Sequence, residues 1–247
     1  MTLYAIGDIH GHLDKLDRAL SLVEADGGAS ARIVFLGDYV DRGPESKGVI
    51  ARLADGLDAG RPWTCLKGNH DRIMEWFFED EPRQDPHMMI EYHWCHEMIG
   101  GRETLASYGV TVPEKIRLSE LHERALPALP DRHLAFLRGL DLYHEAGRYL
   151  FVHAGIRPGQ PLAAQTQEDM VWIRQPFLSH GGPHPWIVVH GHTAIESPTH
   201  YRNRINVDGG AAYGNALVPV ALEEDGSAFA LTEEGRRPMA PRDNRPS

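Results

Sequence analysis

The chain has 247 residues, of which 42% are hydrophobic and 24% are charged. These values are ordinary for a globular protein, so the chain can form a sizeable core without disulfides or structural metals. Its net charge of −10 argues against a nucleic-acid backbone or an anionic membrane as the main partner, although a local basic pocket remains compatible with it.

The two cysteines, Cys65 and Cys95, do not form a disulfide framework or a thiol motif, which favours a reducing compartment. The first apolar run begins within a few residues of Met1, leaving no room for a basic segment and an apolar signal region. No run approaches the roughly 18 apolar residues that a membrane span needs. We therefore expect a cytoplasmic protein.

The first predicted strand, residues 3–6, is a short apolar run that ends at Gly7-Asp8-Ile9-His10-Gly11. Apolar residues at positions 13, 16, 20 and 23 then recur at helical spacing before the next strand, which indicates a βαβ unit. If the segment is extended, Asp8 and His10 point to the same side, as two ligands of one ion require. A helix-capping Asp with an unrelated histidine is the alternative.

The second predicted strand, residues 33–36, runs into Gly37-Asp38-Tyr39-Val40-Asp41-Arg42-Gly43. Two acids and a base therefore lie at the carboxyl end of a strand, where open α/β sheets bind ligands. Taken alone, this motif is equally well explained by a salt-bridged turn. Residues 44–59 carry apolar side chains on one face and are predicted to form the second crossover helix.

Three later apolar runs end in the same way. Residues 63–66 precede Asn69 and His70, residues 149–152 precede His153, and residues 186–189 precede His190 and His192. If Asn69 offers its oxygen to an ion, His70 points elsewhere and is available for proton transfer. Nitrogen and oxygen ligands without thiolates favour Mn, Fe, Zn or Mg, and a two-metal site is the simplest interpretation.

Residues 72–138 interrupt the alternation of strands, and we expect a helical insertion that covers one side of the site. Helices are predicted around residues 73–77, 88–97 and 120–140, the last with breaks at Pro127 and Pro130. His87, His93, Cys95 and His96 form a candidate zinc cluster, but a second well-spaced pair is missing. Partly exposed helix histidines are therefore the preferred interpretation.

The C-terminal part is predicted to close the fold with antiparallel strands at residues 204–208, 216–222 and 228–232, the last two around the Asp225-Gly226 turn. Residues 236–247 contain three prolines and little apolar content, so we expect a disordered tail after a single domain of residues 1–235. Arg174 follows another apolar run, residues 169–173, and an ordinary surface arginine would explain it equally well.

Five motifs in order, GDIHG, GDYVDRG, GNHD, HAG and HGHT, resemble the metallo-dependent phosphoprotein phosphatase family, and particularly its small bacterial and phage serine/threonine phosphatases. The resemblance covers roughly residues 1–222. It implies the calcineurin-like α/β fold, in which mixed β-sheets pack as a sandwich with helices on the outer faces. The metal site of that fold lies at the carboxyl ends of the strands.

The resemblance also implies roles for individual residues. Asp8, His10 and Asp38 are expected to bind one metal ion, with Asp38 bridging to a second ion held by Asn69, His153 and His192. Family members commonly read FGHT where this chain has His190, whose role stays open. Substrate phosphate is expected to contact Arg42, Arg174 and Asn69, while His70, oriented by Asp41, is the expected general acid. The stretch DGGAAYG resembles the family's closing DTGAVFGG motif and places Tyr213 near the site.

The expected activity is hydrolysis of phosphate monoesters, as a phosphoserine/phosphothreonine protein phosphatase. Two divalent ions, Mn²⁺ in the first instance, would hold a bridging hydroxide that attacks phosphorus directly. The substrate is then a phosphorylated protein or a small phosphoester, with selectivity expected from residues 72–138 and 156–167. The sequence leaves the native metal and the oligomeric state open.

The alternative is a symmetrical diadenosine tetraphosphate hydrolase or another nucleotide phosphoesterase of the same fold. Those relatives tend to carry Ala at the position of Asp41, so the aspartate favours the phosphomonoesterase. A non-catalytic binding module is disfavoured because every expected ligand, both arginines and His70 are present.

Overall fold

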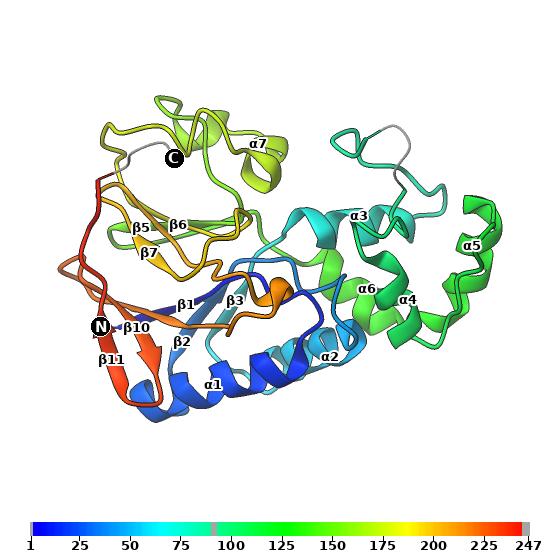
Figure 1. Ribbon diagram of the computed structural model, residues 1–247, viewed down its shortest axis with the longest axis horizontal. Coiled ribbons are helices and arrows are strands. Elements are labelled where there is room, and N and C mark those ends of the chain that lie inside the picture. Colours follow the sequence, from blue (N-terminus) through cyan, green and yellow to red (C-terminus); the bar gives the residue numbers. More distant parts are fainter. Residues whose placement is uncertain (1, 90–92, 244–247) are drawn as a thin grey trace.

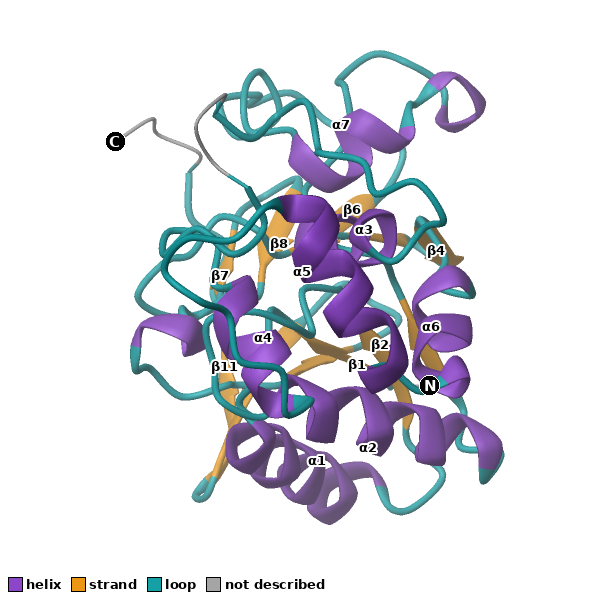
Figure 2. Ribbon diagram, turned by 90° about the vertical axis from the view of Figure 1, so that its right-hand side faces the viewer, coloured by secondary structure: helices purple, strands orange, loops and turns teal. Residues whose placement is uncertain are grey.

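The structure is a computed structural model that describes residues 2–89 and 93–243. It shows two β-sheets packed face to face, with helices on their outer sides (Figure 1). Figure 2 shows α1 and α2 along one outer face and α7 along the other. The sandwich predicted from sequence is confirmed. Among the described residues, no helix combines the length and the apolar character that crossing a membrane requires.

The first sheet has six strands in the order β11-β10-β9-β1-β2-β3. Its strands are β1 (Leu3–Ile6), β2 (Arg32–Phe35), β3 (Trp63–Cys65), β9 (Val220–Leu222), β10 (Ala228–Thr232) and β11 (Gly235–Pro238). The first three are parallel, joined by the crossover helices α1 (Leu13–Gly27) and α2 (Ser46–Asp58), and the last three are antiparallel. The βαβ units expected from the helical spacing of apolar residues are therefore present.

The second sheet has five strands in the order β4-β5-β6-β8-β7. These are β4 (Tyr143–Ala146), β5 (Tyr149–Val152), β6 (Ile187–His190), β7 (Thr199–His200) and β8 (Arg204–Asn206). We expected residues 204–208 among the closing antiparallel strands, and this is confirmed in part: β8 pairs antiparallel with β7, but its other neighbour, β6, is parallel to it. A short apolar pattern indicates a strand but does not specify its partner.

The core between the sheets takes side chains from both, including Ala5 and Val34 from the first and Phe151, Val189 and Ile205 from the second. On the far side of the first sheet, α1 and α2 bury their apolar faces. The helix α7 (Gln167–Trp172) packs Met170 against the outer face of the second sheet. Both sheets are therefore held rigidly, and the loops at their strand ends have fixed starting points.

The helical region between β3 and β4 contains α3 (Asn69–Phe77), α4 (Gly101–Ser107), α5 (Leu118–Ala125), the 3₁₀ turn η1 (Leu126–Ala128) and α6 (Asp131–Arg138). In Figure 1 these helices extend to the right of the sheets. The helix expected at residues 88–97 was wrong for its described part, which forms turns, while residues 90–92 lie outside the described residues. His93 and His96 each accept a backbone N–H two residues on through Nδ1, and such local bonds favour turns over a helix.

The segment after residue 235 was expected to be a disordered tail, and the structure corrects this for its first part. Strand β11 pairs antiparallel with β10 from Gly235 to Pro238. Arg236 on this strand donates to the carboxylates of Asp26 and Glu223, at distances of 2.6 to 2.7 Å. The strand pairing and these ion pairs give regular structure to a segment whose composition predicted disorder. Residues 244–247 lie outside the described part of the chain.

Candidate metal centre and phosphate site

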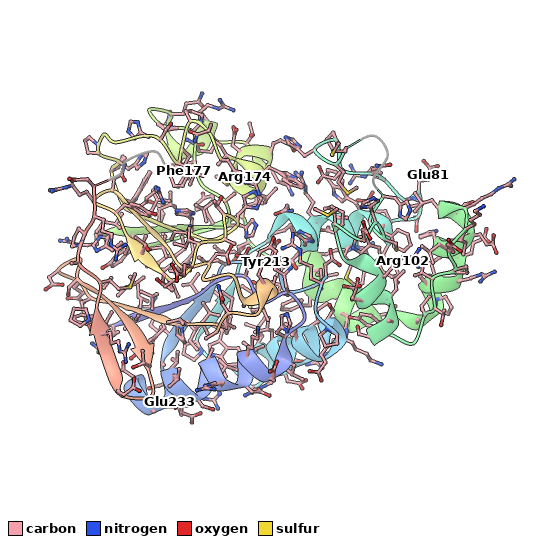
Figure 3. The ribbon with its side chains drawn as sticks, viewed as in Figure 1. Glu81, Arg102, Arg174, Phe177, Tyr213 and Glu233 are labelled. Carbon is pink, nitrogen blue, oxygen red and sulfur yellow. The ribbon has the colours of Figure 1, made fainter. Side chains whose placement is uncertain are left out.

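The loops that follow strands of both sheets line one cavity of about 500 Å³. The expected metal ligands that line it are Asp8, His10, Asp38, Asn69 and His192, and the expected phosphate and proton-transfer residues are Arg42, Arg174 and His70. Figure 3 labels Arg174, just after α7, and Tyr213, on the short helix η3 (Ala211–Tyr213), both of which line the same cavity. The structure therefore brings together residues that are distant in sequence, such as Asp8 and His192, which are 184 positions apart.

The backbone of this site is unusual. Within the described residues, positive φ angles at non-glycine positions occur at His10 (47°), Asp38 (54°), Asp41 (72°), Arg42 (70°) and His192 (64°). All five are residues for which the sequence predicted a functional role. Such conformations cost about 1–3 kcal/mol each and persist where surrounding contacts enforce them, typically at functional sites. They also correct the expectation that Asp8 and His10 lie on one extended segment, because His10 is left-handed.

Asp38 lies between two histidines, with one carboxylate oxygen toward each. Its Oδ2 is 3.6 Å from Nε2 of His10, and its Oδ1 is 3.5 Å from Nε2 of His153. The Nδ1 atoms of these rings donate to the carbonyls of Val40 and Leu36, at 2.9 and 2.8 Å. Since a carbonyl only accepts, the proton of each neutral ring is on Nδ1, and Nε2 is the free acceptor beside Asp38. In His10 this Nε2 atom also accepts from Nη1 of Arg42 at 2.9 Å. Each oxygen of Asp38 therefore belongs to a group of side chains that could hold a cation.

Asn69 gathers the other expected ligands. Its Oδ1 is 3.1 Å from Nε2 of His153 and 2.9 Å from Nδ1 of His192. The first contact joins two acceptors with no proton between them, which is unfavourable unless a cation lies nearby. Nε2 of His192 is buried and has no hydrogen-bond partner among the described residues. These donor atoms therefore fit divalent cations.

The protonation states agree with ligand chemistry. Burial is the main cause that lowers the pKa values of His10, His153 and His192, which favours the neutral imidazole that binds a metal. Burial, followed by repulsion from Asp208, raises the pKa of Asp8 well above its ordinary range. A crowded group of buried carboxylates is electrostatically unfavourable by itself, and bound cations would relieve it.

The expected general acid lies beside these ligands. Nδ1 of His70 is 2.7 Å from Oδ2 of Asp41, which is completely buried. The Arg42 guanidinium reaches Nε2 of His10 at 2.9 Å and Nε2 of His70 at 3.2 Å. A phosphate entering the cavity would thus meet the fork of Arg42 and the Nε2 atom of His70 together.

Two residues that the sequence did not indicate hold Asp41 in place. Nε1 of Trp94 donates to both carboxylate oxygens of Asp41, at 2.9 and 3.1 Å, and Oγ1 of Thr104 donates to Oδ1 at 2.7 Å. They lie 53 and 63 positions from Asp41, in the segment before α4 and in α4 itself. No local pattern connects them to the motif, so only the fold reveals them.

Asp71 was also missed, although it ends the GNHD motif. Its carboxylate accepts the backbone N–H groups of Asp38, Tyr39 and Gly68, at 2.7 to 2.9 Å. Burial, then repulsion from Asp38, raises the pKa of Asp71 to about 7. Gly68 is required here, because a Cβ atom at this position would lie 2.1 Å from Oδ1 of Asp38. Asp71 thus connects the loop that follows β2 to the start of α3 by hydrogen bonds.

The remaining histidines singled out from sequence lie elsewhere. His190 is buried, and its Nε2 atom is 3.1 Å from Nη1 of Arg204. Burial is the main cause that lowers the pKa of His190 to about 3. It is not among the residues that line the cavity. The candidate zinc cluster does not form among the described residues, since no group of three ligands includes His93, Cys95 or His96. His87 instead stacks on Trp172, with ring centroids 5.3 Å apart.

The chain is similar to known proteins over most of its length. A profile of the calcineurin-like phosphoesterase family matches residues 1–218. The asymmetrical bis(5′-nucleosyl)-tetraphosphatase PrpE of Oceanobacillus iheyensis is 26% identical over 252 residues, which cover 91% of this chain and 90% of that protein. The symmetrical bis(5′-nucleosyl)-tetraphosphatase of Methylococcus capsulatus is 33% identical over 159 residues, which cover 64% of this chain and 44% of that protein.

Among solved structures, the cold-active protein-tyrosine phosphatase of a psychrophilic Shewanella species has a TM-score of 0.59 and 16% identity. That alignment covers 97% of this chain and 80% of the phosphatase, and it supports the fold alone. The family match extends over most of the chain and includes all the expected metal-binding residues. The chain therefore belongs to the calcineurin-like phosphoesterase family.

Proposed function

We propose that this chain is a metal-dependent hydrolase of dinucleoside polyphosphates, of the asymmetrical bis(5′-nucleosyl)-tetraphosphatase type. The observation that carries the phosphoesterase chemistry is the bridging position of Asp38 between His10 and His153, with Arg42 beside it. The choice of substrate rests on the asymmetrical relatives, one of which aligns with 91% of this chain.

This proposal replaces the protein phosphatase expected from sequence. That expectation rested on Asp41, which the resemblance implied to be uncommon in symmetrical diadenosine tetraphosphate hydrolases. The relatives matched over nine-tenths of the chain are instead named as asymmetrical enzymes, whereas the symmetrical relative covers only 64% of it. On that resemblance, Asp41 argues against the symmetrical class and gives no argument against the asymmetrical one.

Two divalent cations would be held by Asp8, His10 and Asp38 on one side and by Asp38, Asn69, His153 and His192 on the other. When bound, they would neutralise phosphoryl oxygens and lower the pKa of the attacking water. The ligand set of nitrogen and oxygen accepts Mn²⁺, which we propose as the first ion to test.

The residues of the chain supply the rest of the chemistry. Arg42 and Arg174 would donate forked hydrogen bonds to the non-bridging phosphate oxygens. His70, held by Asp41, would give a proton to the departing phosphate oxygen. The water oxygen forms a bond to phosphorus, and the P–O–P bond breaks with its electron pair on the departing oxygen. A dinucleoside tetraphosphate then yields a nucleoside triphosphate and a nucleoside monophosphate, with the remaining proton of the water released to solvent.

The test is to strip the protein of metal, add back Mn²⁺ and compare initial rates at equal concentration on diadenosine tetraphosphate and on phosphoserine and phosphothreonine peptides. We expect a higher kcat/KM on the dinucleotide, with ATP and AMP as products on ion-exchange chromatography. Asp38→Asn serves as the inactive control. A higher kcat/KM on the peptides, or ADP as the sole product, would overturn the proposal.

A further inference from the structure

Two aromatic side chains line the cavity, and one of them is already engaged. The ring of Trp172 stacks on His87 with an interplanar angle of 15°. It also makes a T-shaped contact with the ring of His192, with the two ring centroids 5.8 Å apart. Its Nε1 donates to Oδ2 of Asp85 at 3.2 Å. Trp172 is therefore a wall of the cavity, fixed by neighbours of its own.

Tyr213 is different, because it lines the cavity and yet is 68% exposed. The helix η3 that carries it is flanked by left-handed turns at Gly210 (φ 76°) and Gly214 (φ 97°). Nζ of Lys15 donates to main-chain carbonyls in and just after this helix, at 2.7 and 2.9 Å. The side-chain amide of Asn215 donates to a third carbonyl just before it, at 2.8 Å. The loop is thus pinned to α1 while it presents a large ring to solvent.

The ring of Tyr213 lies next to the charge that meets phosphate. The Cζ atom of Arg42 is 5.5 Å from the ring centroid, and the same guanidinium reaches His10 and His70. An aromatic surface and a phosphate-binding cation are therefore adjacent in one cavity. Its volume, about 500 Å³, lies within the usual range for small-molecule sites. A nucleotide has this pattern, with a planar base separated from its phosphate by one sugar.

We propose that Tyr213 is the platform on which one nucleobase of the dinucleotide stacks, while Arg42 binds a phosphate of the same nucleotide. This inference rests on the proposed function and specifies how its substrate is recognised. Because every base has an aromatic face, stacking on Tyr213 tolerates adenine and guanine alike. Residue 213 then discriminates phosphates that carry a nucleobase from phosphates that lack one, and it acts in substrate binding and not in bond cleavage.

The test compares two ligands that differ only in the base, AMP and ribose 5-phosphate, by isothermal titration calorimetry on the Mn²⁺-loaded protein. We expect the wild type to bind AMP more tightly. Tyr213→Ala should weaken AMP binding by about 5- to 150-fold and leave ribose 5-phosphate unchanged. Tyr213→Phe keeps the ring and should retain AMP affinity. Tyr143→Ala is the matched control, since this tyrosine is 41% exposed on β4 and is not among the cavity-lining residues.

Equal affinities of the wild type for the two ligands, or equal losses of both in Tyr213→Ala, would overturn the platform. The outcome is separable from that of the proposed function. A wild type that selects AMP through Tyr213 but leaves diadenosine tetraphosphate intact contradicts the function and keeps the platform. A wild type that cleaves the dinucleotide, together with a Tyr213→Ala protein that binds AMP normally, supports the function and contradicts the platform.

Discussion

Replacing Trp94 by phenylalanine isolates the contribution of the helical region to the catalytic pair. Trp94 is 2% exposed, and its ring packs on Phe77 with centroids 4.7 Å apart, a contact that phenylalanine can keep. The change removes the indole N–H from the buried carboxylate of Asp41. A hydrogen bond to a charged group contributes about 1.5–3 kcal/mol. In a chain of this size that loss corresponds to a fall in Tm of about 3–12 °C.

The same substitution should slow the reaction, because Asp41 fixes the ring of His70. We expect kcat to fall by about tenfold, part of the 10²–10⁴-fold that general acid catalysis supplies, with KM nearly unchanged. Thermal melting and steady-state kinetics of the metal-loaded protein measure both effects. Trp186→Phe, at a partly buried residue directly before β6, controls for the loss of an indole elsewhere. A Trp94→Phe protein with the Tm and kcat of the wild type would refute the reasoning.

Three further predictions concern other parts of the molecule. Asp85→Asn removes the carboxylate that pairs with Arg72, with Oδ2 and Nη2 2.7 Å apart, while Arg72 keeps its second partner Glu168. The free energy of unfolding in urea titrations should fall by about 1.5–3 kcal/mol, and a loss below about 1 kcal/mol would show that this pair contributes no more than an exposed one. His70→Asn should lower kcat far more on an alkyl phosphate than on p-nitrophenyl phosphate, whose leaving group needs no proton; equal losses would exclude the role of general acid. Burial raises the pKa values of the Cys65 and Cys95 thiols to about 12, so the folded protein keeps these thiols protonated at pH values where the unfolded chain would lose the protons. Their contribution to folding stability is therefore complete below the unfolded thiol pKa of about 8.5 and is lost as the pH rises toward 12. Native thiols should therefore resist Ellman's reagent at pH 8, and rapid labelling of the folded protein would contradict this.

The parts of the site that were predictable from sequence are those built from local patterns. A short apolar run that ends in a metal-binding side chain near a glycine is visible without any knowledge of the fold. It occurs at Asp8, Asp38, Asn69, His153 and His192. The structure brings these residues together, since four of them line one cavity and His153 contacts Asn69 and Asp38 behind it. Strand ends could be located in this way because buried strands and glycine turns both have strong sequence signals.

The parts that were not predictable depend on the path of the chain between distant elements. Trp94 reaches Asp41 from a segment where the sequence favoured a helix and the described residues form turns, and Thr104 reaches it from α4. Asp85 lies in a loop whose acidic, proline-containing composition is typical of exposed segments, yet it is 1% exposed and pairs with Arg72. Such contacts are set by tertiary packing, which no local pattern encodes.

The most direct test of the account is an anomalous difference map from crystals soaked in Mn²⁺. The account predicts two peaks roughly 3.5–4 Å apart, as in two-metal phosphatase sites, one on each side of the Asp38 carboxylate. One peak should contact His10 and the other Asn69 and His192. A single peak, or peaks away from Asp38, would contradict the dinuclear site on which the proposed function depends.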